Sequence, residues 1–192
     1  MNRSQALDVA HAMMLETGWD RVRFGEVAVR VGVSRPTLYA AFGNKDGLAE
    51  ALVLRETDRF LVGIDEVLQA HSGDLGAAVR EAVRFVLDEA ARSPLLHAVL
   101  TSTRGGNDSL LPLLTTRSAP VQQAATAALT RWFAEQLPGE AGLPDAVDAL
   151  VRLVVSHLVL PAEHPETTPQ RLSTLMLRTL DVDQAAGRST RA

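Results

Sequence analysis

The sequence predicts an all-α fold. Apolar residues recur three and four positions apart along most of the 192-residue chain, and this spacing places them on one face of a helix. No stretch alternates apolar and polar residues between hairpin turns, as a half-buried strand would. Glycines and prolines divide the chain into segments of helical length.

This punctuation sets the expected bounds of each helix. The first helix starts after Ser4 and stops at Gly18, which serves as a left-handed cap. Gly32 ends the second helix, and Ser34 and Asn44 cap the third and fourth. A loop or short broken helix is expected over 104–119. The helices after the first are expected at 24–31, 35–42, 45–70, 75–91, 94–103, 120–137, 144–160 and 168–182. The buried face of the first helix is expected to carry Leu7, Ala10, Met14 and Leu15.

Composition excludes several classes of protein. The chain contains no cysteine, which excludes a disulfide scaffold, a thiol nucleophile and cysteine-ligated metal sites, and which fits a reducing cytoplasm. Residues 1–15 lack the apolar run of a signal peptide. The longest apolar stretch, 153–160, is far shorter than the roughly 20 residues of a membrane helix. We therefore expect a cytoplasmic protein that does not bind a membrane.

Charge is distributed unevenly along the chain. The net charge is −4, yet residues 21–45 contain Glu26 as their only acid beside five basic side chains. The rest of the chain is acidic. A basic segment joined to an acidic body is typical of a DNA-binding part attached to a domain with another task.

The basic segment contains a helix-turn-helix. Three short helices have Gly32 between the second and the third, where glycine permits a left-handed backbone. Ser34 is expected to accept a hydrogen bond from the Thr37 amide, because Pro36 has no amide hydrogen. In this motif the first residues of the second helix, here Arg35, Pro36 and Thr37, reach base edges in the major groove.

Residues 5–52 resemble the N-terminal domain of TetR-type (tetracycline-repressor-like) transcriptional regulators. Gly18-Trp19, Val27-Ala28 and the string GVSRPTLYAAFGNKDGL over 32–48 carry the resemblance. It implies a small DNA-binding head and a larger helical domain that forms a dimer and usually binds a small effector.

The resemblance also assigns DNA contacts. By position, Arg35 reads a base edge, most naturally guanine, and Pro36 makes an apolar contact in the groove. Thr37, Tyr39 and Lys45 hold phosphates. The complete expected set is Arg23, Ser34, Arg35, Pro36, Thr37, Tyr39 and Lys45.

The chain departs from the family pattern at two places. Arg23 stands where the family usually has a capping Thr or Ser, so either Arg23 contacts phosphate or Gly25 and Glu26 reshape the start of the second helix. Ala40 and Ala41 replace larger residues and remove one usual DNA contact. Arg21 and Arg23 are interpreted equally well as solvated charges. Trp19 is expected in the core. Tyr39 is alternatively a surface aromatic residue without a DNA contact.

The C-terminal half predicts a dimerising bundle. In the helix 144–160 the polar residues form one narrow stripe and almost all other residues are apolar, so most sides of the helix need covering. The alanine-rich helix 120–137 permits close approach of another helix. Together they predict a symmetric four-helix interface between two subunits. The alternative is that both helices belong to the core of a single chain. The expected interface residues are Val121, Ala125, Ala128, Leu129, Trp132, Leu150, Val154 and Leu158.

A pocket for an apolar or amphipathic effector is expected in the same half, because the helices 94–103 and 120–137 carry few charges. Its candidate residues, each with an alternative as plain core, are Phe85, Leu96, His97, Leu100, Trp132 and Met176. No histidine pair has metal-binding spacing, and no nucleotide-binding loop is present. We therefore expect no cofactor, no metal and no enzymatic activity.

The sequence thus predicts a dimeric transcriptional repressor that reads a two-fold-symmetric DNA site and is released from it by a small apolar or amphipathic ligand. Residues 1–47 form the helix-turn-helix domain, 48–182 the effector-binding and dimerisation domain, and 183–192 a flexible tail. Two alternatives stay open: a constitutive DNA-binding protein without a ligand, and a helical interaction module or enzyme with a vestigial DNA-binding head.

Overall fold

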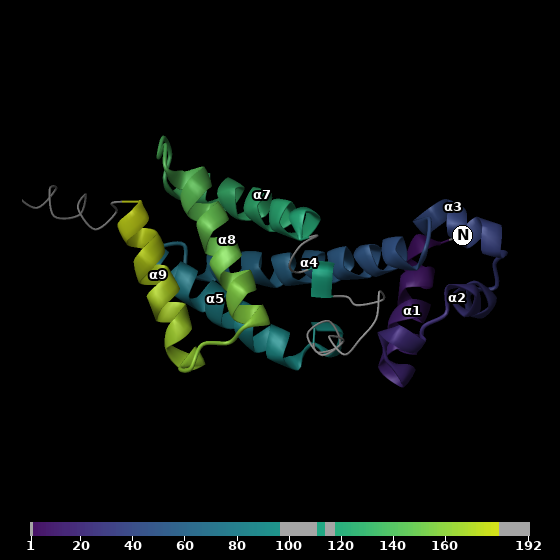
Figure 1. Ribbon diagram of the computed structural model, residues 1–192. Helices are drawn as coiled ribbons and strands as arrows, with labels where there is room; N and C mark the ends of the chain where they lie inside the picture. The colour runs from purple at the N-terminus through teal and green to yellow at the C-terminus, as the bar shows by residue number, and fades with distance from the viewer. Residues whose placement is uncertain (1, 97–110, 114–117, 181–192) are drawn as a thin grey trace, which may run out of the picture. The chain divides into compact units, whose positions relative to one another are not determined.

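The computed structural model describes residues 2–96, 111–113 and 118–180, and all regular elements in these ranges are helical (Figure 1). The α-helices are α1 (Arg3–Thr17), α2 (Phe24–Val31), α3 (Arg35–Phe42), α4 (Lys45–Ala70), α5 (Leu75–Arg92), α7 (Ala119–Gln136), α8 (Leu143–Val159) and α9 (Thr168–Thr179). Short 3₁₀ helices are η1 (Trp19–Arg21), η2 (Leu111–Leu113) and η3 (Pro165–Thr167). This confirms the all-α prediction. Within the described ranges, the helices are all too short or too polar to cross a membrane.

The chain divides into two compact units. The head unit comprises residues 1–57 and 91–121, and the body unit comprises residues 58–90 and 122–192. Helices α4, α5 and α7 each contribute residues to both units. The expected flexible tail, 183–192, lies outside the described residues.

Local signals fix the ends of α2, α3 and α4 as the sequence predicts. Gly32 ends α2 in the left-handed conformation, with φ 75° and ψ 31°. The Ser34 hydroxyl accepts a hydrogen bond from the Thr37 amide at 3.3 Å, and the Asn44 side chain accepts one from the Gly47 amide at 2.9 Å. Each cap satisfies an amide that has no partner within its helix.

Three expectations about α1 are wrong. The helix begins before Ser4, because Asn2 caps it and accepts a hydrogen bond from the Ser4 amide at 3.0 Å. Gly18 has a positive φ of 82° but an extended ψ of 153°, so it is not a left-handed helical cap and instead leads the chain into η1. Leu15 is 53% exposed. Consecutive residues of a helix point in different directions, and Leu15 lies outside the buried face that includes Met14. The other three residues expected on this face are buried.

The remaining helix ends agree with the expected bounds to within one residue, apart from α9. That helix ends at Thr179, and Leu180 lies in a turn, whereas the sequence predicts a helix to residue 182. The segment expected as the helix 94–103 is helical over 94–96 and then leaves the described residues. Most of the expected loop over 104–119 also lies outside them.

The head unit has a small aliphatic core formed by α1, α2, α3 and the first turns of α4. Leu38 and Leu48 are fully buried, and Trp19 is also buried, which confirms its interpretation as a core residue. Arg3 donates a hydrogen bond to the Ala41 carbonyl at 2.9 Å, and its guanidinium lies 4.6 Å from the ring centroid of Phe42. The start of α1 is thereby fixed to the end of α3.

The body unit buries one continuous cluster drawn from α4, α5, α7, α8 and α9. Trp132 and Phe133 meet edge to face, with ring centroids 4.9 Å apart. The ring of Phe85 lies directly over Gly63 on α4, where a Cβ atom would come within 2.2 Å of the ring. Gly63 therefore provides the space that this ring occupies.

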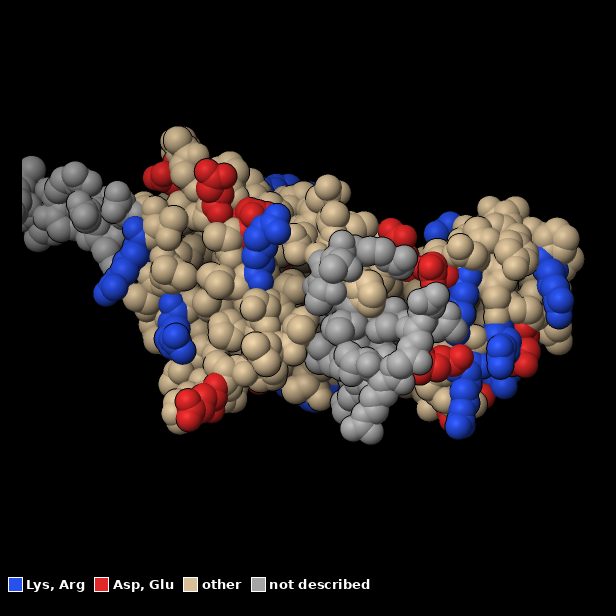
Figure 2. Space-filling model, in the orientation of Figure 1, with Lys and Arg blue, Asp and Glu red and all other residues tan. Residues whose placement is uncertain are grey.

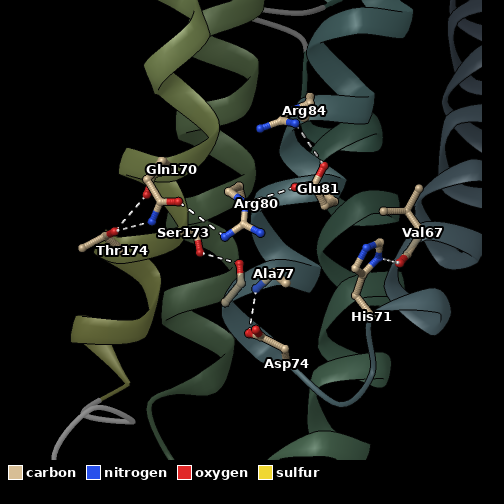
Figure 3. Close-up of polar contacts among 11 residues, drawn as sticks. Val67, His71, Asp74, Ala77, Arg80, Glu81, Arg84, Gln170, Ser173 and Thr174 are labelled. Carbon is tan, nitrogen blue, oxygen red and sulfur yellow. Dashed lines mark hydrogen bonds and ion pairs between the residues drawn. The ribbon is translucent and has the colours of Figure 1, made fainter.

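Polar contacts join α9 to the start of α5 (Figure 3). The buried hydroxyl of Ser173 donates a hydrogen bond to the Gly76 carbonyl at 2.8 Å. The Asp74 side chain caps α5 by accepting from the Ala77 amide at 2.9 Å. The Asp74 cap satisfies an amide that has no partner within its helix, and the Ser173 hydrogen bond gives a buried hydroxyl a partner on α5.

Candidate nucleic-acid interface

The turn between α2 and α3 has the geometry that a helix-turn-helix needs. Its backbone closes through hydrogen bonds from the Gly32 amide to the Val29 carbonyl at 3.1 Å and from the Val33 amide to the Ala28 carbonyl at 3.0 Å. Val33 is half-buried within the turn, while Val27, Ala28 and Val31 on α2 are buried. The turn therefore holds α3 in one orientation against α2.

Helix α3 separates a buried face from an exposed face. Leu38 and Phe42 point into the core. The residues expected to contact DNA from this helix and its cap are all exposed, namely Ser34, Arg35, Pro36, Thr37 and Tyr39. Such an exposed first turn is what a recognition helix presents to the major groove.

Three of these side chains, Ser34, Thr37 and Tyr39, have contacts that orient them. The hydroxyls of Ser34 and Thr37 are hydrogen-bonded to each other at 2.8 Å, which orients the Thr37 oxygen at the helix N-terminus. The Tyr39 ring packs edge to face on Phe24 of α2, with ring centroids 4.8 Å apart. Both hydroxyls remain at the surface, where they are able to meet phosphate oxygens.

Lys45 lies at the start of α4 and is partly buried. Its ammonium donates to the Asp20 carbonyl at 3.3 Å and lies 5.5 Å from the ring centroid of Trp19. These contacts hold the amine against η1, and the free N-terminal amides of α4 also favour an anion.

The basic residues in α2 and just before it differ in their surroundings. Arg23 stands at the N-cap position of α2 without a capping hydrogen bond from its side chain, as expected, and both Arg21 and Arg23 are exposed. Arg30 forms an ion pair with Glu16 at 2.9 Å, so part of the basic excess is neutralised within the head. Figure 2 shows Lys and Arg atoms over the head unit with Asp and Glu atoms among them.

Arg3 adds a cation that sequence reasoning missed. Its contact with Ala41, 38 residues along the chain, brings it beside the end of the recognition helix. No local signal around residue 3 indicates this position, because the contact depends on how α1 packs against α3.

Comparison with known proteins identifies the family. Residues 6–52 match the model of bacterial regulatory proteins of the tetR family, and residues 74–178 match that of the bacterial tetracyclin repressor C-terminal domain. The chain belongs to the TetR family. It is a DNA-binding transcriptional regulator with an N-terminal helix-turn-helix and a C-terminal helical domain, as the resemblance implies.

Individual TetR-family relatives agree with this assignment. The chain is 32% identical over 163 residues to the HTH-type transcriptional regulator AlkX of Mycobacterium tuberculosis, a match that covers 84% of this chain and 76% of that protein. It is similar to the crystal structure of the repressor AlkX from Dietzia sp., with a TM-score of 0.77, 28% identity, and coverage of 94% of this chain and 96% of that chain. The repressor QsdR of R. erythropolis shares the fold, with a TM-score of 0.68, 21% identity and coverage of 91% and 93%.

The residues expected to line an effector pocket are only partly brought together. Trp132 and Met176 are buried in the body-unit cluster, and Phe85 packs against that cluster. Leu96 is buried in the head unit, and His97 and Leu100 lie outside the described residues. The Trp132 indole nitrogen is buried without a hydrogen-bond partner among the described residues. Within those residues, no group of three His, Asp or Glu side chains is placed to hold a metal ion.

The residues expected at a dimer interface divide into two groups. Trp132 and Leu150 are already buried within a single chain, so they offer little surface to a second one. The others are half-buried on α7 and α8, namely Val121, Ala125, Ala128, Leu129, Val154 and Leu158. The interface therefore stays a prediction. The partial exposure of these six apolar side chains supports it, because they are accessible to a second chain.

Proposed function

We propose that this TetR-family protein is a homodimeric repressor that binds a two-fold-symmetric operator and is released from it by a small apolar or amphipathic effector. The capped, exposed first turn of α3 carries the proposal. Two such helices, one from each subunit, enter successive major grooves about 34–36 Å apart. The function places the protein in the cytoplasm, where the chromosome of a bacterial cell lies.

Arg35 is the proposed base-reading residue. It is exposed at the N-terminal end of α3, and its planar fork matches the two acceptors of guanine in the major groove. Thr37, Tyr39 and Lys45 are the proposed phosphate contacts, and Ser34, Pro36 and Arg23 complete the surface. We assign this role to residues 1–47, and effector binding and dimerisation to 48–182.

An apolar effector is supported by the composition of the body unit. Its interior is a cluster of aliphatic and aromatic side chains, and a similar repressor, AlkX of Dietzia, is implicated in the biodegradation of n-alkanes. The effector favours release only by the amount by which it binds the released state more tightly than the DNA-bound state. Helix α4, which contributes residues to both units, is the proposed coupling element.

Selection of bound sequences from a random duplex pool tests the DNA-binding proposal. We expect enrichment of a site with two-fold symmetry, followed by release when apolar compounds are added to the complex. Binding without enrichment, with a steep dependence on salt, would mean that the head holds phosphates but reads no sequence.

Substitutions then separate base contacts from phosphate contacts. Arg35→Ala is expected to cost about 1–3 kcal/mol at the selected site and to relax specificity at one base position. Lys45→Ala is expected to weaken binding to all sequences alike and to reduce the slope of log K against log salt by about one. Titrations of the operator and of a scrambled duplex at two salt concentrations measure both effects, and equal behaviour of the two variants would contradict the assignment.

A further inference from the structure

The first turn of α2 lies against the DNA-facing side of α3. Phe24 contacts the ring of Tyr39, and the next residue, Gly25, lies beneath the guanidinium of Arg35. A Cβ atom at position 25 would lie 2.9 Å from Arg35 Nε, 3.0 Å from Nη2 and 3.1 Å from Cζ. The missing side chain of Gly25 therefore leaves the space that the Arg35 fork occupies.

The Arg35 fork lies against Gly25 and has no polar partner there. Among the described residues, Arg35 has no hydrogen bond or ion pair, and its side chain is exposed. Its donors are therefore all available to a base, while the contact with Gly25 limits the positions that the fork adopts. A long arginine side chain loses considerable rotamer freedom when it is fixed on a ligand, and a fork held in advance loses less on binding.

We propose that Gly25 is a positioning residue for sequence recognition: it admits the Arg35 guanidinium against the start of α2 and so orients it toward the major groove. The inference rests on the proposed role of Arg35 in base reading. It concerns specificity and not the fold, because the group that a methyl would displace is the far end of a flexible side chain. Alanine is also a better helix former than glycine.

Gly25→Ala tests this inference. We expect the melting temperature to be equal or higher, the affinity for a scrambled duplex and its salt slope to be unchanged, and the ratio of operator to scrambled affinity to fall about fivefold or more. Sequence selection with the variant should lose preference at the same base position that Arg35→Ala relaxes. A purely structural role for Gly25 would lower the melting temperature and leave that base position intact.

Two comparisons make the test decisive. In an Arg35→Ala background, Gly25→Ala should produce no further change in specificity, because the group it displaces is gone. Gly73→Ala is the matched control, since a Cβ atom there would meet nothing within 4 Å, and it should leave DNA binding unchanged.

Two results would overturn the inference while leaving the proposed function in place. One is an unchanged specificity ratio in Gly25→Ala although Arg35→Ala lowers it. The other is an equal loss from Gly25→Ala with and without Arg35. If Arg35→Ala itself leaves the ratio unchanged, the base-reading role of Arg35 fails, and this inference fails with it.

Discussion

The head unit and the body unit each place a large side chain over a glycine, and the two contacts differ in what a methyl group would displace. At Gly25 it would meet the end of an exposed arginine, and at Gly63 it would meet the ring of Phe85 within 2.2 Å. A methyl group can displace the exposed arginine into solvent, whereas the ring packs against the body-unit core and has no such freedom. The same substitution should therefore change recognition in one unit and stability in the other.

This contrast extends to the surfaces of the two units. The head displays polar and charged side chains on α3, while α7 and α8 leave apolar side chains half-exposed. A surface of the first kind suits the charged, hydrated grooves of DNA, and one of the second kind suits a packed helical interface.

A charge on the apolar surface of α8 should have the largest effect. We expect Leu158→Glu to raise the dimer dissociation constant about 100-fold or more, because a buried and unpaired carboxylate costs several kcal/mol. Operator affinity should fall with it, since two linked heads bind far better than one. Sedimentation at several protein concentrations measures the dissociation constant.

Ser156→Glu is the matched control for that experiment. Ser156 is exposed on the same helix, and a charge there should leave the dimer intact. If both variants remain dimers, the interface lies elsewhere.

Gly63→Ala should have the next largest effect. Forcing a methyl group into the Phe85 ring is expected to destabilise the protein by about 1–3 kcal/mol, which exceeds the gain in helix propensity of up to roughly 1 kcal/mol. Urea unfolding measures the change. The ratio of operator to scrambled affinity for the remaining folded protein should stay constant, in contrast to Gly25→Ala.

A second substitution identifies the cause of the loss. Replacing the ring in Phe85→Leu should make Gly63→Ala less costly, which a double-mutant cycle reveals as a coupling energy between the two positions. Independent effects of the two substitutions would show that the ring does not fill the glycine site in solution.

The two units also differ in how far the sequence alone predicts them. Gly32, Ser34 and Asn44 act on neighbours within three or four residues, so the bounds of α2, α3 and α4 and the exposed face of α3 follow from local chemistry. The contacts of Gly25 with Arg35 and of Gly63 with Phe85 depend on how helices pack. Nothing in the residues around either glycine indicates which side chain will lie over it.

The expected effector pocket shows the same limit. Residues such as Trp132 and Met176 have the size and polarity of both core and pocket residues, and they are buried in the body-unit cluster. Apolar character predicts burial, but it does not distinguish a side chain that touches its neighbours from one that touches a ligand. The dimer residues divide for a related reason, because burial within one chain removes Leu150 from the surface that α8 offers.

The cap of the recognition helix should have a moderate effect confined to the head. Ser34→Ala removes the acceptor for the Thr37 amide and is expected to cost about 1 kcal/mol, while Ser34→Gly should cost only a few tenths of this. Ser4→Ala is a control in the same unit, because Asn2 and not Ser4 caps α1. Thermal unfolding compares the three variants, and equal losses at positions 4 and 34 would contradict the observed caps.

The ion pair on α8 should have the smallest effect, and its size tests whether that stripe of the body faces solvent. Arg152 Nε donates to Asp148 Oδ2 at 2.6 Å, and both side chains are largely exposed. The hydrogen bond and the charge of Asp148 raise the pKa of Arg152. Exposed pairs four residues apart contribute little to stability, and salt screens them. Asp148→Asn should thus lower the free energy of unfolding slightly at low salt and hardly at all at about 1 M salt. A loss that is much larger and insensitive to salt would place the pair in a buried environment, and the partner subunit would then cover the polar stripe of α8 as well as its apolar sides.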